Sequence, residues 1–375
     1  MAARIALNAL FVEPGVVGGT ETYTRSLVRA LGDAAPERRY TLYLAREAAA
    51  TPWDVAANVE IRATPATARS RVRRLGTELA WLERRARRDG AGVLHSMGTT
   101  SPLWGRLPRV VTVHDLIYEA YPDVFPKARL MALRALVPRM LRRADRVITI
   151  SEASARDIAE RYDVPRPKIV VIHLGPGRAP LALEDDEIDR HVRDAGVREP
   201  YVLSVATTQR HKNLAALIEA FAQARRAEPD LTLALVGAAG RADATLRAAI
   251  VRAGLADAVA LCGRVDDATL DALYARAQLF VYPSLYEGFG LPLLEAMERG
   301  VPVLSSDATS LPEVGGEACE FVDARRPEAI AQAIVDLAGD GERRGRLVDA
   351  GRMRAAQFTW RRAAEETIAV YDSVA

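Results

Sequence analysis

One pattern, in which short apolar runs alternate with amphipathic segments, occurs twice along this 375-residue chain. In the first half the apolar runs read ARIALNALFV, YTLYLA, GVLHS, RVVTVHD, RVITIS and KIVVIHLG. The pattern restarts at Tyr201 with YVLSVAT and continues through LTLALVG, VALCG, LFVYPS and PVLSS. Such alternation predicts buried parallel strands covered by helices on both faces. We therefore expect an α/β protein with two Rossmann-like, doubly wound parallel-sheet domains.

The length also favours two domains, because single cores stop growing at about 250–300 residues. Between the two halves the chain loses its apolar runs and gains Pro, Gly and acidic residues. We predict an N-terminal domain over 1–175, a linker over 176–199, a second domain over 200–356, and a C-terminal helix within 357–375 that packs back towards the N-terminal domain. Ligands of open α/β sheets bind outside the carboxyl ends of the strands, so the two domains are expected to face a cleft.

The chain has only two cysteines, Cys262 and Cys319, both in apolar surroundings. Neither a disulfide framework nor a cysteine-rich metal site is therefore expected. No uninterrupted apolar stretch approaches the length of a membrane span, and the N-terminal run is too short for a signal peptide. These features predict a cytoplasmic protein in a reducing compartment.

The net charge is only +2, but residues 60–150 contain 17 Arg and one Lys against eight acidic residues. Within this range SRVRRLGTELAWLERRARR and ARLMALRALVPRMLRRADR interleave Arg with Leu, Met and Trp81 at helical spacing. This pattern is typical of interfacial helices and predicts peripheral binding to an anionic membrane. Solvated Arg-rich faces are the alternative, since the whole chain prefers Arg to Lys. Nucleic acid is not an expected partner, because no stacking platform or nucleic-acid motif is visible.

Two carboxylates, Glu287 and Glu295, stand eight residues apart in YEGFGLPLLEAMERG. The first lies on a turn and the second in the first turns of a helix that Pro292 suits. A carboxylate accepts two hydroxyl hydrogen bonds, and amides at a helix start bind anions. Together they match a ligand with sugar, diphosphate and ribose in series. Acids that complement the helix dipole would explain Glu295 but not Glu287. The amides between them belong to Gly288, Phe289, Gly290 and Leu291.

Arg210, His211 and Lys212 precede the first helix of the second half. Cations at a helix start oppose its dipole unless an anion lies among them, although a solvated basic turn is the alternative. Gly18 and Gly19 precede the first helix of the chain, where backbone amides can receive a phosphate. A flexible turn would explain these two glycines equally well.

His114 and Asp115 end an apolar strand in RVVTVHD. Strand ends of an open sheet face its ligand, which favours a functional role for this pair. A histidine that only makes structural hydrogen bonds is the alternative.

The chain resembles the retaining GT-B glycosyltransferases of glycosyltransferase family 4, and bacterial mannosyltransferases among them. The resemblance covers nearly the whole chain and rests on GGTETY, VHD, ITISEASARDI, RHKN, LVG, GRVDDATLDALYARA and, above all, EGFGLPLLE followed by AMERGVPV. It implies the GT-B fold, a nucleotide-sugar donor held mainly by the C-terminal domain, and an acceptor held by the N-terminal one. It also implies same-face attack with retention of the anomeric configuration, without a metal or a cofactor.

The resemblance further implies roles for particular residues. Glu295 would hold the ribose hydroxyls, and Glu287 would approach the donor sugar. Lys212, with Arg210, would neutralise the diphosphate. The implied catalytic residues are His114, Glu287 and Lys212; the donor-binding residues include Gly18, Gly19, Gly288, Phe289, Gly290 and Leu291; and Asp115 and Tyr118 lie on the acceptor side. Many relatives carry Arg where His211 stands, so Arg210 is expected to substitute from one position earlier.

The segment GRVDDATLDAL bears on the nucleobase. Relatives place the base near the backbone of Val265, and Asp267 could accept from the two N–H groups of guanine. The alternative is that Asp266 or Asp267 caps the next helix. We expect GDP-mannose as donor and a lipid-linked oligosaccharide of O-antigen or exopolysaccharide synthesis as acceptor. The alternatives are a UDP- or dTDP-sugar donor for glucosyl, N-acetylglucosaminyl or rhamnosyl transfer, and a non-catalytic subunit that binds sugar nucleotides.

Overall fold

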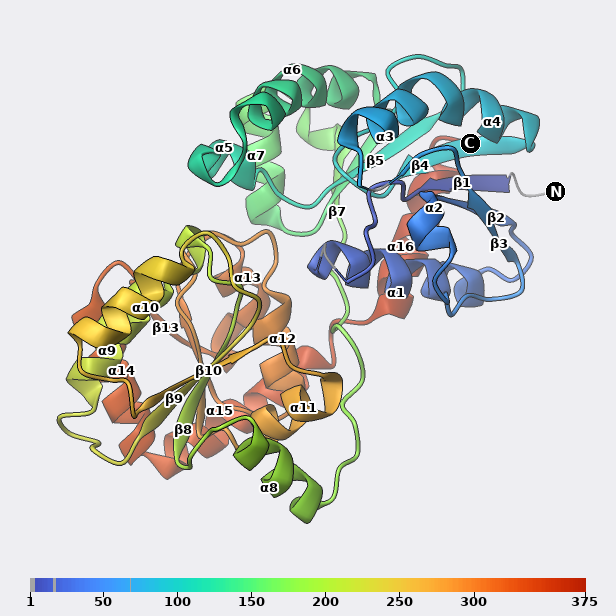
Figure 1. The fold of residues 1–375 in the computed structure, drawn as a ribbon. Coiled ribbons are helices and arrows are strands. Elements are labelled where there is room, and N and C mark those ends of the chain that lie inside the picture. Colours follow the sequence, from blue (N-terminus) through green and yellow to red (C-terminus); the bar gives the residue numbers. More distant parts are fainter. Residues whose placement is uncertain (1–3, 16–17, 68) are drawn as a thin grey trace. The chain divides into compact units, whose positions relative to one another are not determined.

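The computed structural model describes residues 4–15, 18–67 and 69–375, and the chain forms two compact units (Figure 1). Unit 1 comprises Met1–Tyr118, Phe125–Gly177 and Phe358–Ala375, and unit 2 comprises Glu119–Val124 and Arg178–Gln357. Each unit is built on one parallel sheet with helices on both faces. The prediction of two Rossmann-like α/β domains is confirmed.

The described residues of unit 1 form a seven-stranded sheet in the order β3-β2-β1-β4-β5-β6-β7. All neighbouring strands run parallel. The order reverses between β1 and β4, as in other doubly wound sheets, where ligands bind beyond the carboxyl ends of such strands. The strands are β1 (Arg4–Asn8), β2 (Tyr40–Leu44), β3 (Val59–Ala63), β4 (Ala91–Ser96), β5 (Arg109–Val113), β6 (Arg146–Thr149) and β7 (Ile169–Val171).

Unit 2 repeats this topology in a six-stranded parallel sheet ordered β10-β9-β8-β11-β12-β13. Its order reverses between β8 and β11, so the loops that follow these two strands are the expected ligand position. The strands are β8 (Tyr201–Val205), β9 (Thr232–Val236), β10 (Val259–Gly263), β11 (Leu279–Tyr282), β12 (Val303–Ser306) and β13 (Glu320–Val322).

The helices of unit 1 cover its sheet on both sides. Leu82, Ala86, α6 and α7 pack on one face of the sheet, whereas Tyr23 of α1 and Tyr371 of α16 contact Thr112 and His95 on the other face. A π-helical segment, Glu78–Leu82, joins α3 and α4. The helices are α1 (Gly19–Ala34), α2 (Arg46–Ala49), α3 (Arg71–Thr77), α4 (Glu83–Arg88), α5 (Ile117–Ala120), α6 (Lys127–Arg143), α7 (Glu152–Tyr162) and α16 (Trp360–Asp372).

Helix α16 belongs to unit 1 although it follows unit 2 in the sequence. It packs along α1, and the Tyr371 hydroxyl lies 2.7 Å from Nδ1 of His95 on β4. Nε2 of His95 lies 2.8 Å from the Thr112 hydroxyl, which in turn lies 2.9 Å from the hydroxyl of Tyr23 on α1. Because all four side chains are buried, this chain of hydrogen bonds fixes α16 to the sheet.

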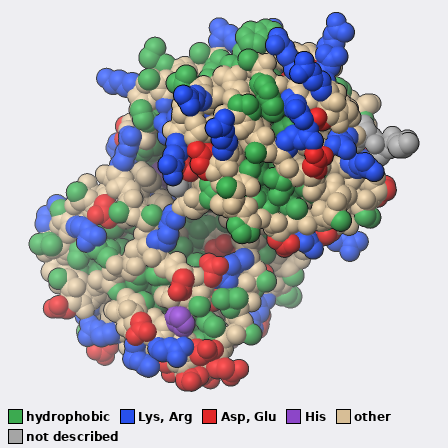
Figure 2. All heavy atoms as spheres, turned by 45° about the vertical axis from the view of Figure 1, so that its right-hand side comes forward, with side chains coloured by type: hydrophobic (Ala, Val, Ile, Leu, Met, Phe, Trp, Pro, Cys, Tyr) green, Lys and Arg blue, Asp and Glu red, His purple; other side chains and the backbone are tan. Residues whose placement is uncertain are grey.

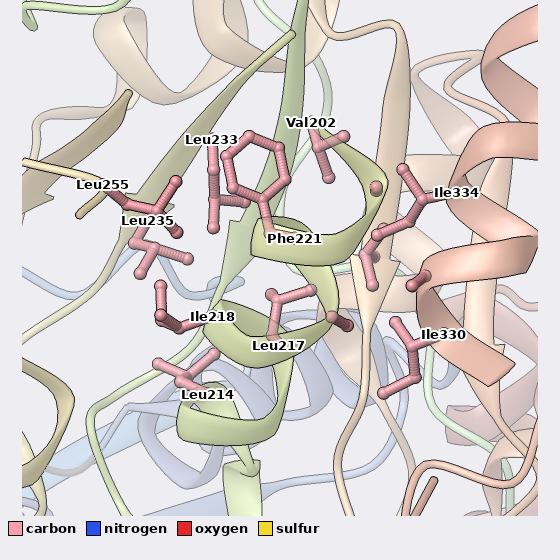
Figure 3. Close-up of a cluster of buried hydrophobic side chains, with 14 of the residues drawn as sticks. Val202, Leu214, Leu217, Ile218, Phe221, Leu233, Leu235, Leu255, Ile330 and Ile334 are labelled. Carbon is pink, nitrogen blue, oxygen red and sulfur yellow. The ribbon is translucent and has the colours of Figure 1, made fainter. Parts of the chain in front are cut away.

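The core of unit 2 lies between its sheet and helices α9, α10 and α14 (Figure 3). The side chains of α9 point towards those of β8, β9 and α14, and Phe221 is fully buried among them. Burial of one such side chain stabilises the fold by about 1.5–3 kcal/mol. The helices are α8 (Asp185–Asp194), α9 (Leu214–Ala224), α10 (Asp243–Arg252), α11 (Asp267–Arg276), α12 (Leu291–Glu298), α13 (Leu311–Gly315), α14 (Pro327–Gly339) and α15 (Gly341–Ala355).

The structure departs from the sequence pattern at three strands. The first apolar run extends to Val12, but β1 ends at Asn8, because the side-chain oxygen of Asn8 accepts from the Leu10 amide and turns the chain. The pattern did not indicate β3, whose outer positions are polar and partly exposed at the sheet edge. Nor did it indicate β13, which has only three residues.

Candidate active site

The loops that follow β8 and β11 meet in unit 2 where the strand order reverses. The loop after β8 ends in a 3-10 turn, Arg210–Lys212, and the loop after β11 carries Glu287. Gly237 allows the neighbouring loop after β9 to pass close by. At its φ of +143° a Cβ atom would lie 2.1 Å from the Ala206 carbonyl oxygen, so only glycine fits there.

A compact polar cluster joins the two loops. Nζ of Lys212 lies 2.6 Å from Oε1 of Glu287 and 3.1 Å from the Tyr282 hydroxyl. The Tyr282 hydroxyl donates to the same Glu287 oxygen at 2.7 Å. The side chains of Lys212 and Glu287 are only 15% and 12% exposed. Two predicted catalytic residues are thus in direct contact, and Tyr282, at the end of β11, orients both.

The ion pair keeps both of its members charged. Burial alone lowers the pKa of a lysine, but the Glu287 carboxylate outweighs this effect and raises the pKa of Lys212. Burial alone raises the pKa of a carboxyl group, yet the Lys212 ammonium holds the pKa of Glu287 below its usual value. The cluster therefore offers a fixed cation beside a carboxylate that can still accept hydrogen bonds.

Residues of a third loop fix the backbone around Glu287. The Glu287 amide donates to the Thr309 hydroxyl at 2.9 Å, and the Ser310 hydroxyl lies 3.0 Å from the carbonyl oxygens of both Glu287 and Phe289. Thr309 has a φ of +52°, which non-glycine residues adopt only at a cost. This loop follows β12 and was not predicted from the sequence. Backbone strain and hydroxyl donors leave no clear motif in a single sequence.

The turn between the two predicted carboxylates ends in a helix start. Gly290 caps α12 with a φ of +109°, and a Cβ atom there would lie 2.6 Å from the Leu311 side chain. Within the described part of the chain, the amides of Gly290 and Leu291 donate no hydrogen bond. Gly288 and Phe289 are buried in the same turn. The turn thus presents two backbone donors at the positive end of a helix.

Glu295 lies in the second turn of α12 and is partly buried. Burial raises the pKa of Glu295 to about 7, although the nearby cations of Arg299 and Arg178 oppose this effect. Arg299 and Arg178 are themselves held by the buried carboxylate of Asp271, at 2.7 and 2.6 Å. Glu295 is therefore a carboxyl group poised to ionise near neutral pH.

The predicted base-binding residues lie in the loop after β10 and at the start of α11. Asp266 is the N-cap of α11, and its side chain accepts from the Thr269 amide at 2.8 Å. Asp267 is 72% exposed and lies 3.3 Å from Nε of Arg178. The capping role thus falls to Asp266, and Asp267 is the first residue of the helix. Val265 precedes them in the same loop.

Arg210 and His211 differ in their surroundings. The side chain of Arg210 is 74% exposed and pairs with Asp123 at 3.1 Å. His211 is buried, and its ring centroid lies 5.7 Å from that of Tyr121. Burial, reinforced by the Lys212 charge, lowers the pKa of His211 to about 4, so this side chain is neutral at pH 7. Of these two residues, only Arg210 is both charged at pH 7 and exposed to solvent.

His114 lies in unit 1, at the end of β5. Its Nε2 atom lies 3.1 Å from the carbonyl oxygen of Met97, and its ring meets that of Tyr23 edge to face at 4.6 Å. Burial lowers the pKa of His114 to about 4. Since a carbonyl can only accept, Nε2 carries the proton of the neutral ring, and Nδ1 is a hydrogen-bond acceptor.

The other predicted residues of unit 1 lie near strand ends. Gly18, with a φ of +55°, caps α1, and Gly19 is the first residue of that helix. Asp115 accepts from the Ile117 amide at 3.0 Å. Tyr118 is buried in α5, and its hydroxyl accepts from that of Tyr162 at 2.9 Å. His114, Asp115 and Tyr118 line one cavity of unit 1.

The chain matches two family models that together span both units. One, described as "Glycosyltransferase Family 4", matches residues 17–175, and the other, "Glycosyl transferases group 1", matches residues 185–354. The chain is 33% identical to an O-antigen chain mannosyltransferase B of Escherichia coli over 279 residues, or 71% of each chain. It is 32% identical to an MMP alpha-(1->4)-mannosyltransferase of Mycolicibacterium hassiacum, covering 62% of this chain and 55% of that one.

A solved structure shows the same fold over the whole length. The sucrose-phosphate synthase of Thermosynechococcus elongatus superposes with a TM-score of 0.78 at 22% sequence identity, over 99% of each chain. Three findings agree with one another: the two Rossmann-like sheets, the polar cluster where the strand order of unit 2 reverses, and the two family models. The chain is a GT-B glycosyltransferase that belongs to glycosyltransferase family 4.

Proposed function

We propose that this glycosyltransferase transfers mannose from GDP-mannose to a lipid-linked glycan in bacterial surface polysaccharide synthesis, with retention of the anomeric configuration. The proposal includes action in the cytoplasm, at the inner face of the cytoplasmic membrane, and no requirement for a metal or cofactor. The names of the two relatives support mannose as the transferred sugar. The name of the first supports a polysaccharide acceptor.

The observation that carries the proposal is the arrangement of Glu287, Lys212 and Glu295 around the start of α12. A charged lysine and the amides of Gly290 and Leu291 suit the two phosphates of a nucleotide sugar. Carboxylates on either side of these amides suit the hydroxyls of a ribose and of a hexose. We assign Glu295 to the ribose and Glu287 to the sugar. Asp267 and Val265 are assigned to the guanine.

The proposed mechanism relies on positioning and on charge. As the bond from the sugar to the diphosphate breaks, negative charge grows on the leaving phosphate, and Lys212, Arg210 and the two amides stabilise it. A leaving phosphate oxygen takes the proton of the acceptor hydroxyl, which attacks the anomeric carbon from the same face. The ring of His114 is neutral, and its Nδ1 atom can accept a hydrogen bond, so His114 is assigned to a hydroxyl of the transferred sugar. Asp115 and Tyr118 are assigned to the acceptor.

Nucleotide titration tests the donor. We expect calorimetry with GDP, UDP, dTDP and ADP to give the tightest binding for GDP, and expect Glu295→Ala to abolish this preference together with most of the affinity. If UDP or dTDP binds most tightly, the donor is a UDP- or dTDP-sugar and not GDP-mannose. Asp267 would then have no role in base recognition. Binding of none of the four would contradict a nucleotide-sugar donor of any of these kinds.

Turnover tests the reaction itself. Incubation with GDP-mannose and a synthetic lipid-linked acceptor is expected to give a mannosylated product, and Lys212→Gln is expected to reduce its formation by at least about a hundredfold. The one-bond carbon–proton coupling at the new anomeric centre reports its configuration. A β-linked product from the α-linked donor would contradict retention.

A further inference from the structure

Unit 1 contains a cavity of about 530 Å³ between α3 and α6, here named the α3/α6 cavity. This volume is within the range of pockets for small ligands. Its lining is mainly apolar and includes Leu75 of α3, Phe125, and Leu133 and Leu136 of α6. Val72, which also lines it, is 83% exposed, and Met131 on α6 is 72% exposed. Large apolar side chains thus face solvent on both helices that border the cavity.

Three arginines line the same cavity, namely Arg71 and Arg74 of α3 and Arg129 of α6. None of them makes an ion pair with another residue of the described part of the chain. Nε of Arg74 is buried without a hydrogen-bond partner there. The Arg129 guanidinium lies over the Phe125 ring, 4.9 Å from its centroid. The cavity therefore combines apolar walls with three positive charges that make no ion pair within the described residues.

The pKa values of Arg74 and Arg129 are lowered by burial and by neighbouring positive charges. Burial, followed by the charges of Arg71 and Arg74, lowers the pKa of Arg129 to about 10. Burial also lowers the pKa of Arg74, although the charges of Glu78 and Glu13 oppose the effect in part. Arg71 and Arg129 are exposed and Arg74 is partly buried, so the three like charges repel one another unless an anion joins them.

Two acidic groups near the cavity already accept hydrogen bonds from other residues. Glu78 is buried, and its two oxygens already accept from Asn8 at 2.6 Å and from Thr100 at 2.8 Å. Burial raises the pKa of Glu78. Asp115 lines the cavity and accepts from the Ile117 amide.

We propose that the α3/α6 cavity binds the phosphate or diphosphate group and the adjoining apolar chain of a lipid-linked acceptor through Arg71, Arg74 and Arg129. A free anion would not need the apolar walls, and an uncharged lipid would not need three arginines. Figure 2 shows, in the view it presents, Lys and Arg side chains among apolar ones over unit 1. The inference rests on the proposed function, because it treats the lipid as the acceptor. His114, which is assigned to the transferred sugar, lines the same cavity.

Farnesyl diphosphate, which joins a diphosphate to a short apolar chain, is a suitable probe below its aggregation concentration. We expect calorimetry with the full-length chain to show binding of farnesyl diphosphate that is at least about tenfold tighter than that of farnesol or of inorganic diphosphate. Equal affinity for inorganic diphosphate would contradict the apolar part of the site, and equal affinity for farnesol would contradict the arginine part.

Matched variants locate the site. Arg74→Gln and Arg129→Gln are each expected to weaken farnesyl diphosphate binding about tenfold, since each removes one charge-assisted contact. Arg73→Gln, at an exposed neighbour on α3 outside the cavity, is the control and should leave the affinity unchanged. Arg129→Lys, which keeps the charge, should retain most of it. Unchanged binding in both arginine-to-glutamine variants would overturn the proposal.

The nucleotide site provides the remaining control. If Lys212→Gln, rather than Arg74→Gln, removes farnesyl diphosphate binding, the probe occupies the donor site and the inference is wrong. GDP titrated into the same variants separates the two proposals. Loss of lipid binding with normal GDP binding identifies the acceptor cavity. If the arginine variants behave as expected while no mannose is transferred, the cavity assignment holds and the proposed function fails.

Discussion

At the scale of single residues, ionisation of Glu295 is expected to govern nucleotide binding. Burial raises the pKa of Glu295 to about 7, and only the ionised carboxyl group can accept from both ribose hydroxyls. Binding then favours the ionised form, so affinity falls as the pH drops below 7 and levels off above it. We expect GDP to bind about tenfold more weakly at pH 6 than at pH 8, measured by calorimetry.

Glu295→Gln is the control for this pH dependence. A phosphate group of the ligand also titrates near pH 6 and contributes equally to both proteins. The variant should bind more weakly and keep only that common part of the dependence. Identical pH profiles for the two proteins would show that Glu295 does not contact the ligand in its ionised form.

A second residue-scale prediction separates the structural role of the Lys212–Glu287 pair from its function. Lys212→Met leaves the Glu287 carboxylate nearly buried without its cation, and is expected to lower the free energy of unfolding of unit 2 by up to about 3 kcal/mol. The double variant Lys212→Met/Glu287→Gln removes both charges and should recover most of that loss without recovering GDP binding. Urea unfolding and calorimetry measure the two quantities. Recovery of GDP binding in the double variant would contradict the assigned role of the cation.

Residue types at strand ends are enough to indicate much of the candidate site. Glu287 and Lys212 stand out because a carboxylate on a turn and a rare lysine at a helix start both need an explanation. Tyr282 and Thr309 could not be predicted in the same way. Tyr282 reads as one more apolar strand residue, and the contact of Thr309 with Glu287 joins segments that only the sheet order brings together.

At the scale of secondary structure, α16 is expected to stabilise unit 1 and not unit 2. Tyr371→Phe leaves Nδ1 of the buried His95 without its partner, which should lower the free energy of unfolding by about 1–3 kcal/mol. Hydrogen exchange followed by mass spectrometry should then show faster exchange in β1 and β4, with β8 and β11 unchanged. Ser373→Ala, near the end of the same helix, is the control. Faster exchange in unit 2 would contradict the assignment of α16 to unit 1.

The strands that the sequence indicated are the mainly apolar ones, because parallel strands covered on both faces are apolar along most of their length. β2, β8 and β9 follow this rule and are almost wholly buried. β3 and β13 do not, because edge strands pair on one side only and tolerate polar residues. Missing strands of this kind changes the number of strands but not the point at which the sheet order reverses.

At the scale of the whole molecule, charge is concentrated in unit 1, while no helix of the described residues is long and apolar enough to cross a membrane. Residues 60–150 alone carry an excess of ten positive charges, and the chain as a whole has only two. The uneven distribution was visible in the sequence. The sequence did not show which arginines remain unpaired, because ion pairs such as that of Arg62 with Asp89 form between distant segments.

This distribution leads to the last prediction, that the protein binds anionic membranes through unit 1. Liposomes that contain phosphatidylglycerol should cosediment the protein at low salt, and binding should fall steeply as the salt concentration rises, because exposed charges are screened. Arg84→Gln/Arg87→Gln, at exposed positions of α4, should weaken binding, because each basic residue near the surface contributes about 1 kcal/mol. Arg226→Gln/Arg252→Gln removes the same charge from exposed positions of unit 2 and should have little effect. Equal weakening by both pairs would assign the attraction to net charge alone, and binding that does not respond to salt would exclude the basic face of unit 1 as its cause.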